Sequence, residues 1–327
     1  MRYCLCLSYD GAEFCGWQIQ PNAPSVQACL EETLSRLLQR PVPVTGAGRT
    51  DTAVNAVHYV AHFDWDGPFP FEASDFTYKL NAMLPRSVVV HSALPAADDF
   101  HARFGATRRE YTYFIHRQKD PFVRQYSWLC AYPELDFDAM NAACRHLLGT
   151  HDFSCFEKTG GDNKTSVCTV MDAFWAPYTP SHIQVLCHTG RSERISCSGE
   201  PVEGIAPKTH GHPRPCKGEG PTEARSADIG RGRSEAEAVF GAIPSAGGGE
   251  FPGAVPPLPN YWYFRIAADR FLRNMVRATV GSLIEVGRGK HRPEWIAELI
   301  ATGTRGDAGE SVPGHALFLN KVSYNEK

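Results

Sequence analysis

Apolar residues recur along this chain with two different periods, every second residue in some segments and every three or four residues in others. Residues 3–9 have the first period, which predicts a strand with one buried face. Residues 26–38 have the second, with Val26 and four leucines on one stripe, and Ser25 is suited to cap a helix that Pro41 ends. Strands and helices that intersperse in this way indicate an α+β fold.

The same two periods predict the remaining elements. The expected strands cover residues 42–44, 57–63, 110–115, 166–174, 182–187, 261–267 and 317–324, and the expected helices cover residues 74–80, 138–148, 271–286 and 293–301. Leu148, at the end of one helix, is expected to face inward. We therefore expect two similar sheet-and-helix units, an N-terminal unit of residues 1–100 and a C-terminal unit of residues 101–327.

Residues 199–259 interrupt the second unit. This stretch holds 12 Gly and 10 Pro in 61 residues, about 36%, against about 12% in the rest of the chain. A content above roughly 25–30% without a repeat is typical of chain that does not fold. We predict a disordered, solvated insertion between two strands of the sheet.

Composition excludes several classes of protein. The 327 residues have a net charge of −3, and no apolar run approaches the roughly 20 residues that span a bilayer. The N-terminus lacks the apolar block of a signal peptide. The 11 cysteines contain no tandem CxxC pairs, which favours reduced thiols over disulfides or structural zinc. We expect a cytoplasmic protein with no membrane segment and no metal.

Two local runs are basic although the whole chain is slightly acidic. Residues 103–124 contain six basic and two acidic residues, and residues 265–292 contain seven and two. Aromatic residues are interleaved in both runs. Most charge runs are solvated faces, but binding to nucleic acid depends on such local patches rather than on net charge.

The glycine-containing loop of residues 46–51 is the strongest candidate for chemistry. It matches half of a dinucleotide-binding fingerprint, but Asp51 replaces the third glycine and would repel a pyrophosphate. His58 and His62 share one face of a strand without carboxylate partners, so we expect core-facing structural histidines rather than a metal site. No P-loop and no nucleophile elbow occurs. The loop still offers Arg49 and Asp51, of opposite charge, to a ligand.

Six motifs in order then resemble the tRNA pseudouridine synthase A family. They cover nearly all of the chain outside the insertion, and the segment from Gly309 to Leu319 is similar to the last loop and strand of that family. The motifs are Gly48-Arg49-Thr50-Asp51 with Val54 and Ala56, Lys79-Leu80-Asn81-Ala82-Met83-Leu84-Pro85, Phe100-His101-Ala102-Arg103-Phe104, Arg109-Glu110-Tyr111-Thr112-Tyr113, Gly149-Thr150-His151-Asp152-Phe153 and Phe271-Leu272-Arg273-Asn274-Met275-Val276-Arg277.

The resemblance implies an isomerase that converts uridine to pseudouridine at positions 38 to 40, in the anticodon arm of tRNA. Asp51 corresponds to the catalytic aspartate and Arg49 to the arginine of the catalytic loop. Tyr111 corresponds to the tyrosine that packs against the target base, and Arg277 to the arginine that pairs with the aspartate. The resemblance also implies a homodimer with tRNA lying across both subunits.

The fold and the RNA contacts follow as further expectations. We expect two ferredoxin/RRM-like units whose antiparallel sheets join across a central basic cleft that holds Asp51. Tyr111 would supply an aromatic surface to a flipped base. Contacts to phosphates are expected from four arginines, Arg103, Arg108, Arg109 and Arg273.

Two residues depart from the family pattern beside Asp51. Ala53 stands where many relatives have glycine, which restricts the backbone, and Asn55 stands where they have histidine, which removes a proton carrier. The alternative hypothesis is therefore a catalytically impaired RNA-binding protein of the same fold.

The reaction itself sets requirements for the site. It breaks the glycosidic bond, turns the uracil, joins C5 to the sugar and removes the C5 proton. An ionised Asp51 could act as nucleophile or as base. Uracil is both leaving group and acceptor, so no cofactor or metal is expected.

Overall fold

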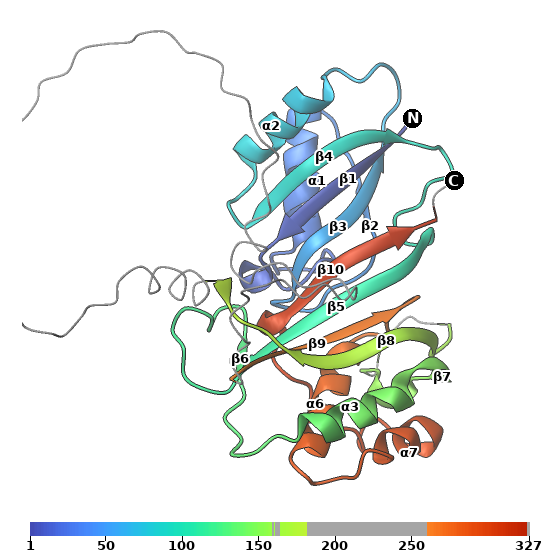
Figure 1. Ribbon diagram of the computed structural model, residues 1–327. Helices are drawn as coiled ribbons and strands as arrows, with labels where there is room; N and C mark the ends of the chain where they lie inside the picture. The colour runs from blue at the N-terminus through green and yellow to red at the C-terminus, as the bar shows by residue number, and fades with distance from the viewer. Residues whose placement is uncertain (159, 161–163, 182–259, 326–327) are drawn as a thin grey trace, which may run out of the picture. The chain divides into compact units, whose positions relative to one another are not determined.

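One mixed sheet organises the part of the chain that the computed structural model describes, which is residues 1–158, 160, 164–181 and 260–325. Its strands run in the order β4-β1-β3-β10-β5-β9-β8-β7, with β2 beside β3 and β6 beside β5 (Figure 1). The strands are β1 (Arg2–Tyr9), β2 (Thr45–Gly46), β3 (Asn55–Asp64), β4 (Val88–Ala96), β5 (Ala106–His116), β6 (Trp128–Leu129), β7 (Gly149–Asp152), β8 (Val167–Pro177), β9 (Tyr261–Ala268) and β10 (Leu317–Tyr324).

The sheet brings together segments that are far apart in sequence. Strand β10 pairs with β3 in parallel, where Phe318 lies opposite Asn55, and with β5 in antiparallel orientation. The sheet is therefore mixed where β3 and β10 pair, and not antiparallel throughout. Because β10 separates β3 from β5, the last strand connects the segment after Asp51 to the strand that carries Tyr111.

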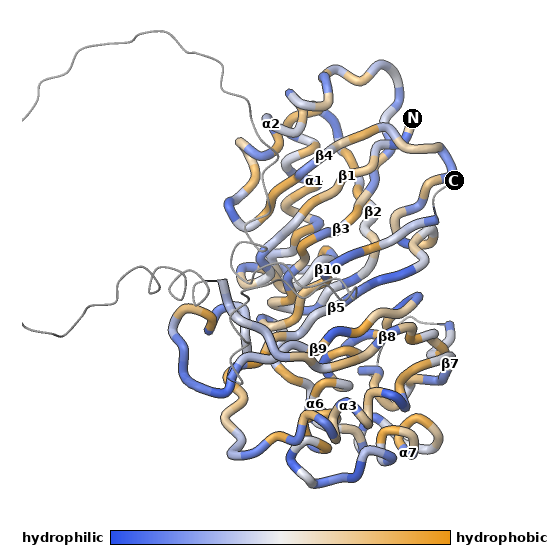
Figure 2. The backbone as a smooth tube through the Cα atoms, viewed as in Figure 1, coloured by the Kyte–Doolittle hydropathy of each residue, from blue (hydrophilic) through white to orange (hydrophobic). Residues whose placement is uncertain are grey.

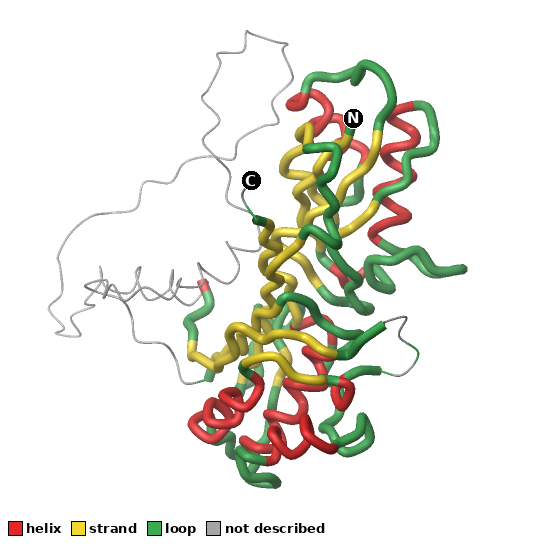
Figure 3. The backbone as a smooth tube through the Cα atoms, turned by 90° about the vertical axis from the view of Figure 1, so that its right-hand side faces the viewer, coloured by secondary structure: helices red, strands yellow, loops and turns green. Residues whose placement is uncertain are grey.

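Helices lie beside both halves of the sheet. They are α1 (Val26–Leu38), α2 (Ala73–Met83), α3 (Phe137–Cys144), α6 (Met275–Gly287) and α7 (Trp295–Thr302). Helices α1 and α2 lie beside β1, β3 and β4, whereas α3, α6 and α7 lie beside β7 to β9 (Figure 1). In the turned view of Figure 3 the strands form a continuous layer with helices beside it. Among the helices of the described residues, none combines the length and the hydropathy of a transmembrane segment.

The periodicities that predicted β1 and α1 are confirmed. In β1 every second residue, from Tyr3 to Tyr9, is buried. In α1, Val26 and Leu30 belong to the buried stripe, and the Ser25 hydroxyl accepts a hydrogen bond from the backbone N–H of Ala28 at 3.2 Å. The helix ends because Gln39 adopts a left-handed conformation with φ of 58°, two residues before Pro41. Much of the apolar chain in Figure 2 lies on the strands of the sheet.

Several predicted elements differ from the observed ones. Residues 42–44 are not a strand, because the N–H groups of Val42 and Val44 donate to the side chains of Ser35 and Glu31 on α1 instead of to a neighbouring strand. Strand β4 was not predicted.

Helix α6 starts later than expected, at Met275, because Asn274 has a left-handed φ of 66°. Leu148 lies beyond the end of α3 and is 42% exposed, so the inward orientation is wrong. The predicted strand 182–187 and the insertion 199–259 lie outside the described residues.

The two histidines of β3 have different environments. His62 is buried and accepts a hydrogen bond from the N–H of Ala102 through Nδ1 at 3.2 Å. His58 is exposed, so the core-facing placement is wrong for that residue. Burial lowers the pKa of His62 to about 4, with the charge of Arg2 acting in the same direction, which keeps the ring neutral and able to accept this bond.

Candidate active site

The loop between β2 and β3 carries Asp51 and is fixed by buried aromatic residues. The hydroxyl of Tyr9, on β1, hydrogen-bonds to Thr50 Oγ1 at 2.9 Å. The hydroxyl of Tyr59, on β3, donates to the carbonyl oxygen of Gly48, and Trp17 stacks on Tyr59 with 4.2 Å between ring centroids. Gly48 and Thr50 flank Arg49, so both anchors lie within three residues of Asp51.

The backbone of the loop also runs directly against other backbone. A Cβ at Gly16 would lie 2.3 Å from the carbonyl oxygen of Thr50, and a Cβ at Gly314 would lie 2.4 Å from that of Thr52. Only glycine permits such an approach. Ala53 adopts a φ of 61°, a left-handed conformation that costs a non-glycine residue about 1–2 kcal/mol. The departure from glycine at this position therefore falls where glycine is favoured.

Asp51 meets an arginine from the far half of the chain. Arg277 Nη1 lies 3.4 Å from Asp51 Oδ2, and 226 residues separate the two in sequence. The Arg277 side chain is oriented by a second bond, from Nε to the carbonyl oxygen of Val312 at 2.7 Å. The Asp51 side chain stays 29% exposed, so it is both ion-paired and open to a ligand.

Tyr111 lies on β5, close enough to Asp51 for the two to interact electrostatically. Its ring is buried and packs edge-on against Phe271, with 5.0 Å between centroids. Burial raises the pKa of Tyr111 to about 12, and the negative charge of Asp51 acts in the same direction while Arg109 opposes it. The phenol is therefore protonated at neutral pH. The structure thus brings Asp51, Arg277 and Tyr111 together.

Three of the other predicted arginines have exposed side chains. Arg49 lies between the two anchored residues of the loop, and Arg273 precedes α6. Arg103 lies in the loop of residues 101–105, with its guanidinium 5.6 Å from the ring centroid of Phe104, which is 77% exposed. Exposed arginine side chains are common contacts for the phosphates of nucleic acids.

Arg108 and Arg109 are placed differently. Successive side chains of a strand point to opposite faces, so Arg108 lies on the face opposite to Tyr111. There its guanidinium is 3.7 Å from Glu110 and 4.0 Å from Asp172. Arg109 shares the face of Tyr111 but donates to backbone carbonyl oxygens, including that of Ala47 at 2.9 Å. The structure therefore does not bring Arg108 to Asp51, and it gives Arg109 internal partners.

Asn55 has a role that the sequence did not reveal. It is buried, its Oδ1 accepts from the N–H of Gly11 at 2.8 Å, and its Nδ2 donates to the carbonyl oxygen of His315 at 2.8 Å. Asn55 thereby joins three segments at the end of the loop that carries Asp51. The sequence could have indicated this role, because Asn55 lies at the start of an apolar strand, where a buried polar side chain needs hydrogen-bond partners.

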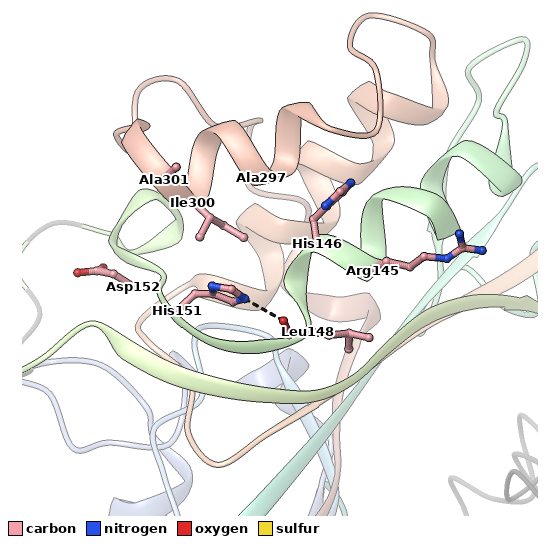
Figure 4. Close-up of a pocket in the computed structure, with 8 residues that line it drawn as sticks. All are labelled: Arg145, His146, Leu148, His151, Asp152, Ala297, Ile300 and Ala301. Atoms are coloured by element: carbon pink, nitrogen blue, oxygen red, sulfur yellow. Dashed lines mark hydrogen bonds between the residues drawn. The ribbon is translucent and has the colours of Figure 1, made fainter.

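A separate hollow of about 500 Å³ lies between α7 and the segment from Arg145 to Asp152 (Figure 4). It contains none of the predicted site residues. His151, from the fifth motif, donates from Nε2 to the carbonyl oxygen of Leu148 at 2.8 Å, which is a bond within its own turn. Within the described residues, no three His, Cys, Asp or Glu side chains are grouped so that they could hold a metal ion.

The sequence of the chain is similar to those of known proteins. A family model described as tRNA pseudouridine synthase matches residues 143–325. The chain is 35% identical over 329 residues to a tRNA pseudouridine synthase A of Parabacteroides distasonis, covering 100% of this chain and 97% of the relative. It is 36% identical over 325 residues to one of Bacteroides thetaiotaomicron, covering 99% and 91%. The chain therefore belongs to the tRNA pseudouridine synthase A family.

Proposed function

We propose that this protein isomerises uridine to pseudouridine in the anticodon stem-loop of tRNA, at positions 38 to 40, and that Asp51 is the nucleophile or base. The observation that carries the proposal is the arrangement of Asp51, which is partly exposed, 3.4 Å from Arg277 and close enough to Tyr111 to act on it electrostatically. A carboxylate held by a cation yet open to a ligand is suited to act on a sugar carbon or a proton.

The reaction is balanced within the nucleoside. The bond between C1′ and N1 breaks, the uracil turns, and C1′ bonds to C5; N1 ends with a proton, and the proton of C5 is released. Asp51 attacks as a nucleophile or acts as a base, and in either role it must be ionised. Arg277 holds the carboxylate through the ion pair and is itself oriented by Val312.

Tyr111 is proposed as the surface that receives the target base. A stacked base must leave the helix before the reaction, at a cost of a few kcal/mol, and an aromatic surface offsets part of that cost. Burial holds the ring of Tyr111 against Phe271, so the ring is already in place when the base arrives.

The proposal includes the RNA contacts and the organisation of the protein. Arg49, Arg103 and Arg273 have exposed side chains and would contact phosphates of the anticodon arm along a basic cleft. Two ferredoxin-like units, residues 1–100 and 101–327, would form this cleft. We also propose a cytoplasmic homodimer that needs no cofactor.

Tritium release tests the proposal. A tRNA transcript labelled at C5 of uridine should lose label with the wild-type protein, whereas Asp51→Asn should abolish release and keep tRNA affinity within about tenfold, because it removes a charge and little volume. The matched control is Asp66→Asn, which makes the same change at an exposed residue after β3 and should release label like the wild type.

The results separate the alternatives. A protein that binds tRNA without releasing label would be the impaired RNA-binding protein. Release by Asp51→Asn at the wild-type rate would contradict the assignment of Asp51.

A further inference from the structure

Arg109 has an arrangement that does not fit a contact to RNA. Its guanidinium donates five hydrogen bonds, and within the described chain every acceptor is a backbone carbonyl oxygen. Nε and Nη2 donate to Ala47 at 3.3 and 2.9 Å, Nη2 also donates to Arg103 at 2.6 Å, and Nη1 donates to Asp269 at 2.6 Å and to Ala106 at 3.4 Å. An arginine has five N–H donors, so a phosphate could bind only by displacing a carbonyl.

The four acceptors belong to three segments around the site. Ala47 lies in the loop that carries Asp51, four residues before it. Arg103 and Ala106 bracket the turn that exposes the ring of Phe104. Asp269 directly follows β9 and starts the segment that leads to Arg277 on α6. The planar guanidinium of Arg109 therefore connects the segments that carry Asp51, Phe104 and Arg277.

The segment of Asp269 is anchored to a neighbouring strand of the sheet. The side chain of Asp269 accepts from the N–H of Thr169, on β8, at 2.8 Å, and its N–H donates to the carbonyl oxygen of Thr169 at 3.1 Å. Arg109 itself extends from β5, a central strand. The guanidinium therefore attaches the two loops, at Ala47 and Arg103, to a rigid part of the sheet.

We propose that Arg109 is a positioning residue of the isomerisation. It holds the loop of Asp51 and the loop of Arg103 and Phe104 in one arrangement, and it does not contact RNA phosphates. This inference rests on the proposed function for its effect on rate. Arginine is required because its fork reaches several acceptors at fixed angles, whereas a lysine ammonium on a flexible stem does not hold them in one plane.

Two variants test the proposal. Arg109→Lys keeps the charge and Arg109→Met keeps only the stem. For both we expect the single-turnover rate of tritium release at saturating protein to fall by about 100-fold, because displacement of a reacting group by about 1 Å has that effect. The slope of log affinity for tRNA against log salt should equal that of the wild type.

Arg103→Met and Arg36→Met are the comparisons. Arg103 has an exposed side chain in the loop of residues 101–105, and the loss of one phosphate contact should reduce the slope of log affinity for tRNA against log salt by about 0.7–0.9. Arg36 lies on α1 with a side chain that is 69% exposed, and its variant controls for loss of one positive charge.

Amide hydrogen exchange gives a readout without tRNA. In the Arg109 variants the N–H groups of residues 47–50 should exchange faster than in the wild type, whereas those of β1 should not change. This measurement tests the positioning role even if the wild type releases no label. A wild type that releases no label would contradict the proposed function and not the positioning role. If Arg109→Met does not fold, the same measurements on Arg109→Lys test the proposal.

Three results would overturn the proposal. The first is a salt slope reduced by about 0.7–0.9 with an unchanged saturating rate, which would make Arg109 a phosphate contact. The second is a lysine variant with a rate within threefold of the wild type, since charge alone would then suffice. The third is unchanged exchange of residues 47–50 in both variants.

Discussion

Replacing Ala53 by glycine should stabilise the protein, although most changes from alanine to glycine destabilise. Ala53 has a φ of 61°, which costs alanine about 1–2 kcal/mol that glycine does not lose. The greater freedom of glycine in the unfolded chain offsets about 0.4–1 kcal/mol of this gain. Loss of the half-buried methyl group offsets about 0.4 kcal/mol more. The net expectation is a gain of about 0.5 kcal/mol in the free energy of unfolding.

Ala56→Gly provides the matched control. Ala56 is buried in β3 and does not have a positive φ, so the same change should cost about 0.5–1 kcal/mol for the backbone and about 0.8 kcal/mol for the methyl group. The two variants should therefore differ by about 2 kcal/mol, or about 4–8 °C in Tm.

Thermal and urea unfolding of the two variants measure this difference. Ala53→Gly should also keep the rate of tritium release within about threefold, because the loop that holds Asp51 already has the conformation that glycine favours. Equal destabilisation by the two changes would refute the argument, since residue 53 would then not be left-handed in solution.

Three further predictions concern single side chains. Arg277→Met should lower the saturating rate at least about 100-fold with little effect on tRNA affinity, since Arg277 contacts Asp51; a loss of affinity alone would contradict its role. The pKa of His62 is lowered to about 4 by burial, whereas the unfolded chain takes up this proton near pH 6.5, so the free energy of unfolding should fall between about pH 6.5 and 4 by up to ~1.4 kcal/mol per unit. His62→Asn should flatten that profile in urea titrations, and an unchanged slope would exclude His62 as its source. Glu110→Gln should lower the free energy of unfolding by about 3 kcal/mol in urea titrations, because the buried carboxylate lies 2.5 Å from Arg265. The saturating rate of tritium release should not change. An unchanged free energy of unfolding would contradict this prediction.

Periodicity predicted the elements that pack through one face. The stripe of α1 and the alternation of β1 were sufficient because each buries one side against the core. Residues 42–44 were mispredicted because their backbone partners are the side chains of Ser35 and Glu31, which no local pattern contains. Strand alternation could have separated Arg108 from Arg109, since only Arg109 shares a face with Tyr111.

The site could not be assembled from spacing. Asp51 and Arg277 are 226 residues apart, and nothing local in either segment indicates the other; the family resemblance supplied that pair. The partners of Arg109 are main-chain oxygens, which every residue possesses, so the sequence cannot single them out. Likewise, the clamp made by Asn55 depends on Gly11 and His315, from two distant segments.

The central position of β10 has a consequence for synthesis on the ribosome. A nascent chain that stops at residue 316 would already contain Asp51, Tyr111 and Arg277. It would nevertheless leave β3 and β5 as open edges, which invite pairing with other chains, and no strand would join the segment after Asp51 to the strand that carries Tyr111. Catalytic competence should therefore arise only after translation has passed the final strand, and premature termination products should be inactive and prone to aggregate.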